Sequence, residues 1–254
     1  MRILLTNDDG INAAGFGVLQ QVAAALSDEV WCVAPETDQS GTAHSLTLHE
    51  PLRCKTIGER SFTVRGTPTD CVIMAIKHLM PIKPDLVLSG INHGENAATD
   101  VTYSGTIAGA IEGTLLGVPS IALSLSFPGR AASTAHWATP VAHGPALIRR
   151  LVAAGWPANV LININFPDRT PDMTLPALVT RQSMQEEAMW GVVDRIDGRG
   201  QRYFWVGLEP RDRATPAPGT DLAAIHQGHI SVTPLHLDLT HEAAMVGLQA
   251  ALGT

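Results

Sequence analysis

A strand, a helix and a second strand are expected within residues 1–35, and this pattern constrains the fold most. Residues 3–5 are an apolar run that predicts a buried strand, and Asn-Asp-Asp-Gly at 7–10 predicts a sharp turn after it. Apolar residues at helical spacing then occupy 15–26, and a second apolar run occupies 30–34. This order is the basic unit of a parallel sheet, so we expect an α/β protein.

The same alternation continues to residue 181. Pro68 lies in the first turn of a predicted helix that extends to residue 79. The whole order predicts a doubly wound, mostly parallel sheet of the Rossmann-like, three-layer type, and we assign residues 1–181 to this α/β catalytic core. Further strands are expected at 46–52, 61–64, 85–89, 121–125 and 160–166, and further helices at 104–116 and 136–154.

The character of the chain changes from Gln182 onward. A lone hairpin and a short helix bury little area by themselves. We therefore predict that residues 182–254 form an oligomerisation arm that contacts another subunit. Its expected parts are a hairpin with strands at 189–193 and 203–208, a Pro-rich linker at 215–219, a final strand and a helix at 241–252.

Composition and charge exclude several classes of protein. Apolar residues make up 45% of the chain, which is enough for a substantial core. The net charge of −7 argues against binding polymeric nucleic acid, because such faces neutralise many phosphates with Lys and Arg. The sequence predicts no signal peptide and no membrane span. The three cysteines, Cys32, Cys54 and Cys71, are widely spaced, which indicates buried, reduced thiols in a cytoplasmic protein.

Asp8 and Asp9 are the strongest single feature of the sequence. They directly follow the first strand, and ligands of open parallel sheets bind just beyond the carboxyl ends of the strands. Gly10 permits the turn that lets both side chains converge. Two carboxylates at short distance repel unless one is protonated or a cation lies between them. The alternative is an exposed turn in which Asp caps a helix, but the strand-end position favours a metal.

Three further polar side chains follow other strands of the expected sheet. Ser40 lies in the polar loop 36–45, and a loop of this length in a compact α/β unit is usually functional. Asn92 and Asn96 lie in a Gly-containing loop after the strand at 85–89, where the glycines permit the backbone to approach a ligand. An ordinary loop hydroxyl and an ordinary Asn turn remain the alternatives.

Ser104-Gly105-Thr106 begins a predicted helix of small residues. A helix start supplies free N–H groups and the positive end of the helix dipole, which together bind anions. Simple capping by Ser104 is the alternative explanation. The histidines do not fall at zinc-ligand spacing, so the oxygen ligands predict Mg²⁺ or Mn²⁺.

Together these motifs resemble the SurE family, the survival protein nucleotidases. The matching segments keep the order and spacing of the family over the first half of the chain. They are TNDDG (6–10), AP (34–35) followed by QSG (39–41), GTPTDC (66–71), SGINHGEN (89–96) and SGT (104–106), with SVTPL (231–235) near the end.

The resemblance implies a metal-dependent phosphatase that removes 5′- or 3′-phosphates from nucleoside monophosphates and, in some members, acts on short polyphosphate. It implies one divalent cation, Mg²⁺ or Mn²⁺, and a homodimer or homotetramer with an exchanged C-terminal segment. Glu95 and Thr69 depart from the usual pattern, since small residues or proline are commoner there. The implied site residues are Asp8, Asp9, Ser40 and Asn92 as metal ligands, Asp8, Asp9 and Asn96 in catalysis, and Asn96, Ser104, Gly105 and Thr106 at the phosphate.

Other function classes compete with this interpretation. A dinucleotide-binding oxidoreductase needs Gly-x-Gly-x-x-Gly after the first strand, but Asn-Asp-Asp-Gly stands there, and its charge would repel a pyrophosphate. An aspartyl-phosphate phosphatase needs Asp-x-Asp in place of two adjacent aspartates. A non-catalytic nucleotide sensor fits the same metal and phosphate residues and differs only in lacking turnover.

Overall fold

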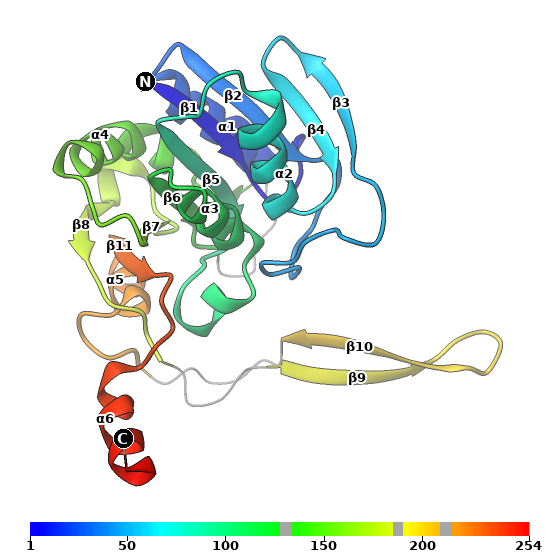
Figure 1. The fold of residues 1–254 in the computed structure, drawn as a ribbon, viewed down its shortest axis with the longest axis vertical. Helices are drawn as coiled ribbons and strands as arrows, with labels where there is room; N and C mark the ends of the chain where they lie inside the picture. Colours follow the sequence, from blue (N-terminus) through cyan, green and yellow to red (C-terminus); the bar gives the residue numbers. More distant parts are fainter. Residues whose placement is uncertain (128–133, 185–189, 209–214, 254) are drawn as a thin grey trace.

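A mixed, mostly parallel sheet organises the molecule (Figure 1), as the sequence predicts. The computed structural model describes residues 1–127, 134–184, 190–208 and 215–253. The strands of the sheet are β1 (Arg2–Thr6), β2 (Glu29–Pro35), β3 (Arg53–Gly58), β4 (Ser61–Arg65), β5 (Leu86–His93), β6 (Ser120–Leu125), β7 (Val160–Phe166), β8 (Leu175–Val179) and β11 (His229–His236). Over the described residues, their spatial order is β3-β4-β2-β1-β5-β6-β7-β11-β8.

Helices cover both faces of this sheet and complete the three layers (Figure 1). Helices α1 (Ala14–Ala24) and α4 (Ala138–Ala154) pack together on one face, and α2 (Pro68–Met74) and α3 (Gly105–Leu115) pack together on the other. The side chains of β1 alternate between the two layers, because Ile3 and Leu5 join the core under α1 while Leu4 joins the core under α2. The apolar runs of the sequence are therefore buried on both faces.

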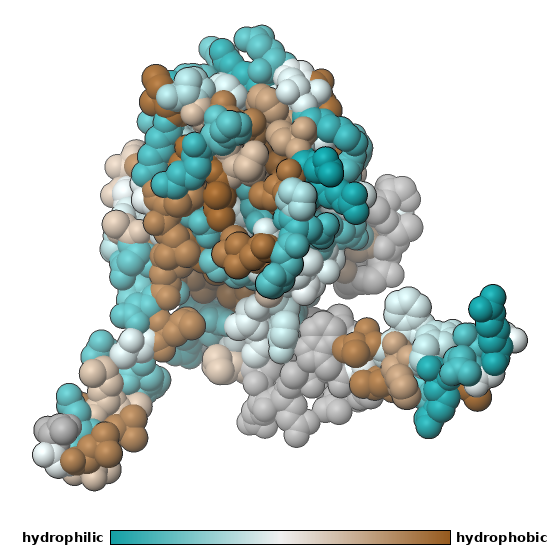
Figure 2. All heavy atoms as spheres, turned by 45° about the vertical axis from the view of Figure 1, so that its right-hand side comes forward, coloured by the Kyte–Doolittle hydropathy of each residue, from teal (hydrophilic) through white to brown (hydrophobic). Residues whose placement is uncertain are grey.

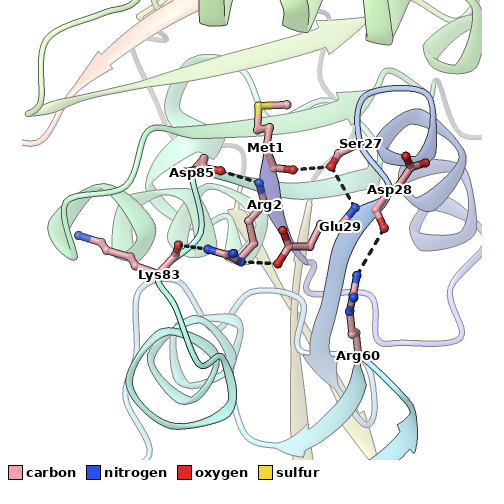
Figure 3. Close-up of polar contacts among 8 residues, drawn as sticks. All are labelled: Met1, Arg2, Ser27, Asp28, Glu29, Arg60, Lys83 and Asp85. Carbon is pink, nitrogen blue, oxygen red and sulfur yellow. Dashed lines mark hydrogen bonds and ion pairs between the residues drawn. The ribbon is translucent and has the colours of Figure 1, made fainter.

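The amino end of β1 is fastened to its neighbours (Figure 3). The Nε atom of Arg2 donates to Glu29 Oε1 at 2.6 Å, and its Nη1 atom donates to the carbonyl of Lys83 at 3.2 Å. The backbone N–H of Arg2 donates to Asp85 Oδ2 at 2.6 Å. These bonds fix β1 between β2 and the chain that enters β5, which leaves the carboxyl ends of the three strands at the opposite edge.

The prediction of a strand at 46–52 is wrong. This segment is irregular, and the strand begins only at Arg53. Leu46 and Leu48 are 47% and 77% exposed, so their alternation does not line a core. The backbone N–H and the hydroxyl of Thr47 donate to Asp70 at 3.1 and 2.6 Å, which ties the segment to α2 in place of a neighbouring strand.

The C-terminal part of the chain adds β11 to the main sheet and then continues to the terminal helix. β11 pairs with β7 on one side and with β8 on the other. The predicted hairpin is present as β9 (Trp190–Ile196) and β10 (Arg202–Leu208), although Met189 lies outside the described residues. The predicted terminal helix is α6 (Glu242–Leu252), and α5 (Asp221–Gln227) precedes β11. A division of the chain after residue 181 stays a prediction.

Two further expectations concern cysteines and membranes. Cys32 and Cys71 are buried thiols as predicted, but Cys54 is exposed because it lies on the edge strand β3. None of the helices in the described ranges combines the length and the apolar character that crossing a membrane requires.

Candidate metal and phosphate site

The candidate site lies where the sheet changes its winding direction. β1 pairs in parallel with β2 on one side and with β5 on the other. This arrangement is a topological switch point, at which the loops beyond the carboxyl ends of the strands diverge and leave room for ligands. Asp8 and Asp9 lie in the turn that follows β1, and Asn92 is the second-last residue of strand β5, where the sequence predicted a loop.

The first turn of α3 packs directly against Asp8. The hydroxyl of Thr106 donates to Asp8 Oδ1 at 2.5 Å, and the Asp8 side chain is buried. A Cβ atom on Gly105 would lie 2.7 Å from the Asp8 Cβ atom and 2.9 Å from its Oδ2 atom. Only glycine permits so close an approach. The predicted metal residues and the predicted phosphate residues are therefore in direct contact.

Burial and repulsion by neighbouring carboxylates disfavour the charged forms of both aspartates. Burial is the main cause that raises the pKa of Asp8, and the hydrogen bond from Thr106 opposes it. Burial and the charge of Asp8 raise the pKa of Asp9 to about 7, although the backbone N–H of His93 donates to this carboxylate and opposes the shift. A bound cation would reverse both shifts, because it stabilises the ionised carboxylates.

The loop that carries Ser40 lies against the same aspartates. The backbone N–H of Gln39 donates to the carbonyl of Asp8 at 2.8 Å. The backbone N–H and the hydroxyl of Ser40 both donate to Asp38 Oδ1 at 2.7 Å. The negative charge of Asp38 raises the pKa of Asp8 and of Asp9, so this third carboxylate belongs to the electrostatics of the site. Sequence reasoning missed Asp38, although its place two residues before Ser40 was a usable signal.

Asn92 lies at the end of β5, one residue before His93. Its Nδ2 atom donates to the carbonyl of Gly94 at 3.0 Å, so its Oδ1 atom points to the other side of the amide group. The neighbouring residue, His93, supplies the backbone N–H that reaches the Asp9 carboxylate.

Asn96 forms its hydrogen bonds with residues of β6 and β7. Its Nδ2 atom donates to Ser124 Oγ at 2.9 Å, and its backbone N–H donates to Asn165 Oδ1 at 2.9 Å. The side chains of Asn163 and Asn165 donate to its carbonyl at 2.7 and 3.1 Å. The structure shows no hydrogen bond between Asn96 and the two aspartates within the described ranges. Asn163 and Asn165 lie at alternate positions of the apolar strand β7 and therefore share one face of it. This signal was present in the sequence but was missed.

Ser104 caps α3, which was the alternative explanation for its position. Its Oγ atom accepts from the backbone N–H of Ile107 at 3.0 Å. Capping of one N–H leaves that of Gly105 without a partner inside the helix, while the backbone N–H of Thr106 donates to the Asp8 carboxylate. The cap and an anion site at the same helix start are therefore compatible.

These donors fit a hard divalent cation. Two carboxylates, an amide oxygen and a hydroxyl are the oxygen ligands that Mg²⁺ and Mn²⁺ prefer. The two desolvated aspartates, held together with raised pKa values, are the observation that calls for a cation between them. In the ranges that the structure describes, no group of three or more His, Cys, Asp or Glu side chains could hold a metal.

Comparison with known proteins gives one consistent result. The family model described as "Survival protein SurE" matches residues 3–189. The 5′-nucleotidase SurE of Azorhizobium caulinodans is 54% identical over 98% of this chain and 97% of its own length. The corresponding protein of Brucella canis is 56% identical over 100% of this chain and 99% of its own. The solved structure of the SurE protein from Aquifex aeolicus is similar at 37% identity, with a TM-score of 0.84 over 99% of each chain.

Proposed function

The chain belongs to the survival protein SurE family, and from this premise we propose that it is a 5′-nucleotidase that uses one divalent cation, Mg²⁺ or Mn²⁺. The observation that carries the proposal is the contact between Asp8 and the first turn of α3. It joins a pair of carboxylates, which bind a cation, to a helix start, which binds an anion. A phosphate monoester between them would meet both kinds of group at once.

We assign the metal to Asp8, Asp9, Ser40 and Asn92. When bound there, the cation supplies Lewis-acid polarisation of the phosphoryl group and lowers the pKa of a coordinated water. The hydrogen bond from Thr106 holds the Asp8 carboxylate in one orientation. The hydroxyl of Ser40 donates a hydrogen bond to Asp38, so the lone pairs of that hydroxyl point away from Asp38.

The remaining residues act on the phosphate and the attacking water. The N–H group at Gly105 donates to a phosphate oxygen and, with the positive end of the α3 dipole, stabilises the negative charge that develops there. Ser104 fixes this helix start by its cap. Asp8 or Asp9 orients the water or accepts its proton, and Asn96 contacts the phosphoryl group from the side of β7. We extend the proposal to 3′-monophosphates and short polyphosphate.

A non-catalytic nucleotide sensor would use the same residues without turnover. Phosphate release from AMP, 3′-AMP and tripolyphosphate, measured with Mg²⁺, with Mn²⁺ and after chelation, separates the two functions. The proposal requires release from AMP that depends on the metal. Binding of AMP with no release under any of these conditions would support the sensor and refute the nucleotidase.

We also propose that β9, β10 and α6 form the contact between subunits of a homodimer or homotetramer. Figure 2 shows hydrophobic side chains on the surface of both segments. Exposed apolar patches of this kind mark protein contacts, and exchange of an identical element between protomers is a low-cost route to oligomers. The exposed side chains are Val192, Val193, Ile196, Tyr203, Phe204, Trp205 and Val206 on the hairpin, and Met245, Val246, Leu248 and Leu252 on α6.

A cytoplasmic location, expected from the sequence, stays a prediction.

A further inference from the structure

The backbone of Ala98 is held in an uncommon conformation next to Asn96. Ala98 is fully buried and has a φ of 51°, in the left-handed region that residues with a Cβ atom rarely adopt. Such a conformation costs about 1–3 kcal/mol and persists only where the surroundings fix it. Only Ala97 separates Asn96 from Ala98 along the chain, so whatever fixes Ala98 also limits where Asn96 can point.

Both backbone groups of Ala98 bind side chains from the distant C-terminal part of the chain. Its N–H donates to Asp221 Oδ2 at 2.9 Å. Its carbonyl accepts from Gln182 Nε2 at 2.6 Å. Apolar contacts support these bonds, because Ala98 also packs with Leu222 and Ile225 of α5.

The same carboxylate joins the two chain segments that lead into and out of the hairpin. Asp221 is fully buried, and its Oδ1 atom accepts from the backbone N–H groups of Ser183 at 2.9 Å and Leu222 at 2.8 Å. The backbone N–H of Asp221 donates to the carbonyl of Arg181 at 2.9 Å. The base of the hairpin and the Ala98 backbone therefore share one carboxylate.

We propose that Asp221 and Gln182 are positioning residues for the phosphate side of the site. They fix the Ala98 backbone and, with Asn163 and Asn165, hold Asn96 in its place. This inference rests on the proposed role of Asn96 in the nucleotidase. Its consequence is that the chain at Gln182 and Asp221 is coupled to the phosphate side of the site, while Asp8 is held independently by α3.

The test uses Asp221→Asn and Gln182→Leu in the full-length chain. An asparagine at 221 offers one oxygen and one N–H₂ group, so it cannot accept on both sides, and a leucine at 182 cannot donate. Asp28→Asn is the matched control, because Asp28 is exposed and lies at the opposite edge of the sheet (Figure 3). For each protein we would measure KM and kcat for AMP, inorganic phosphate binding with Mn²⁺ present, and Mn²⁺ affinity by calorimetry.

We expect the KM and the dissociation constant of phosphate to rise about tenfold in both variants, as loss of one strong hydrogen bond predicts. We expect Mn²⁺ affinity to stay within about twofold of the wild type. Phosphate binding that is unchanged in both variants, or metal and phosphate affinities that fall together, would overturn the inference. If Asp221→Asn does not fold, Gln182→Leu decides alone, because this side chain is only partly buried. A wild type that binds phosphate but releases none from AMP would refute the nucleotidase, and the phosphate measurements would still judge the positioning role.

Discussion

The hydroxyl of Thr106 donates a hydrogen bond to the carboxylate of Asp8, 98 residues away in the sequence, at 2.5 Å. Asp8 follows the first strand of the sheet, and Thr106 lies in the first turn of α3. The bond therefore connects the part of the site that would hold the cation with the part that would hold the phosphate.

Thr106→Val should weaken metal binding without unfolding the protein. Valine keeps the shape of the side chain but removes the donor, so the buried Asp8 carboxylate loses a bond that opposes its raised pKa. We expect Mn²⁺ affinity to fall about tenfold, as measured by calorimetry. Thr114→Val is the matched control, because the hydroxyl of Thr114 bonds only the carbonyl of Ala110 in the same helix. Equal losses in the two variants would show that the Thr106 bond has no special role.

Gly105→Ala should remove most of the activity. The new Cβ atom would lie 2.7 Å from the Asp8 Cβ atom, so either Asp8 or the helix start must move. A displacement of about 1 Å in a reacting site costs roughly 100-fold in rate, and we expect a loss of this size in kcat/KM for AMP. Gly17→Ala in α1 is the control, since its Cβ atom would meet nothing within 4 Å. A Gly105→Ala enzyme with wild-type kcat/KM would contradict the packing described for this helix start.

The metal-free protein should lose stability as the pH rises from about 4 to about 7. The pKa of Asp9 is about 7 in the folded protein against its ordinary value of 3.8, so the folded state binds more protons than the unfolded state between these values. Stability falls with rising pH wherever the folded state binds more protons. Thermal unfolding of chelator-treated protein across this range measures the slope, and Asp9→Asn should reduce it. Identical slopes in the two proteins would mean that Asp9 is not the titrating group.

The apolar side chains of the hairpin should be needed for assembly. Phe204→Ser combined with Trp205→Ser removes two exposed aromatic rings from β10, and we expect light scattering to report a smaller assembly than for the wild type. Leu48→Ser is the control, because Leu48 is even more exposed than these two residues but lies outside the arm. Deletion from Gln182 onward is a poorer test, because it also removes β11 from the main sheet. A wild-type protein that is monomeric and fully active would refute the subunit contact.

The sequence predicted those parts of the fold that carry strong apolar periodicity. The buried strands β1, β2, β6 and β7 were found because consecutive apolar residues pack on both faces. The edge strand β3 was missed, because its residues are exposed and show no apolar pattern, while the leucines before it suggested a strand that does not exist. An edge strand pairs with a neighbouring strand on one side only, and nothing in the local spacing of apolar residues indicates that pairing here.

The sequence could indicate candidate site residues that directly follow strands, but not residues that reach the site from distant parts of the chain. Asp8, Asp9 and Asn92 could be placed by the rule that ligands bind at the carboxyl ends of parallel strands. Asp221 could not, because its bond to Ala98 spans 123 residues and depends on how the chain returns from the hairpin. Such a contact is a property of tertiary packing, and no local motif encodes it.

The most direct test of the proposed function is phosphate release from AMP at increasing Mn²⁺, for the wild type and for Asp9→Asn. Asp9 is proposed as a ligand at a strand end, so in chelator the variant should be at least as thermally stable as the wild type while it loses most of its metal affinity and turnover. The account predicts release by the wild type that saturates with Mn²⁺ and stops on chelation, and release by Asp9→Asn that is close to background at limiting metal. Near-normal release by Asp9→Asn at limiting Mn²⁺, or release by the wild type that survives chelation, would contradict it.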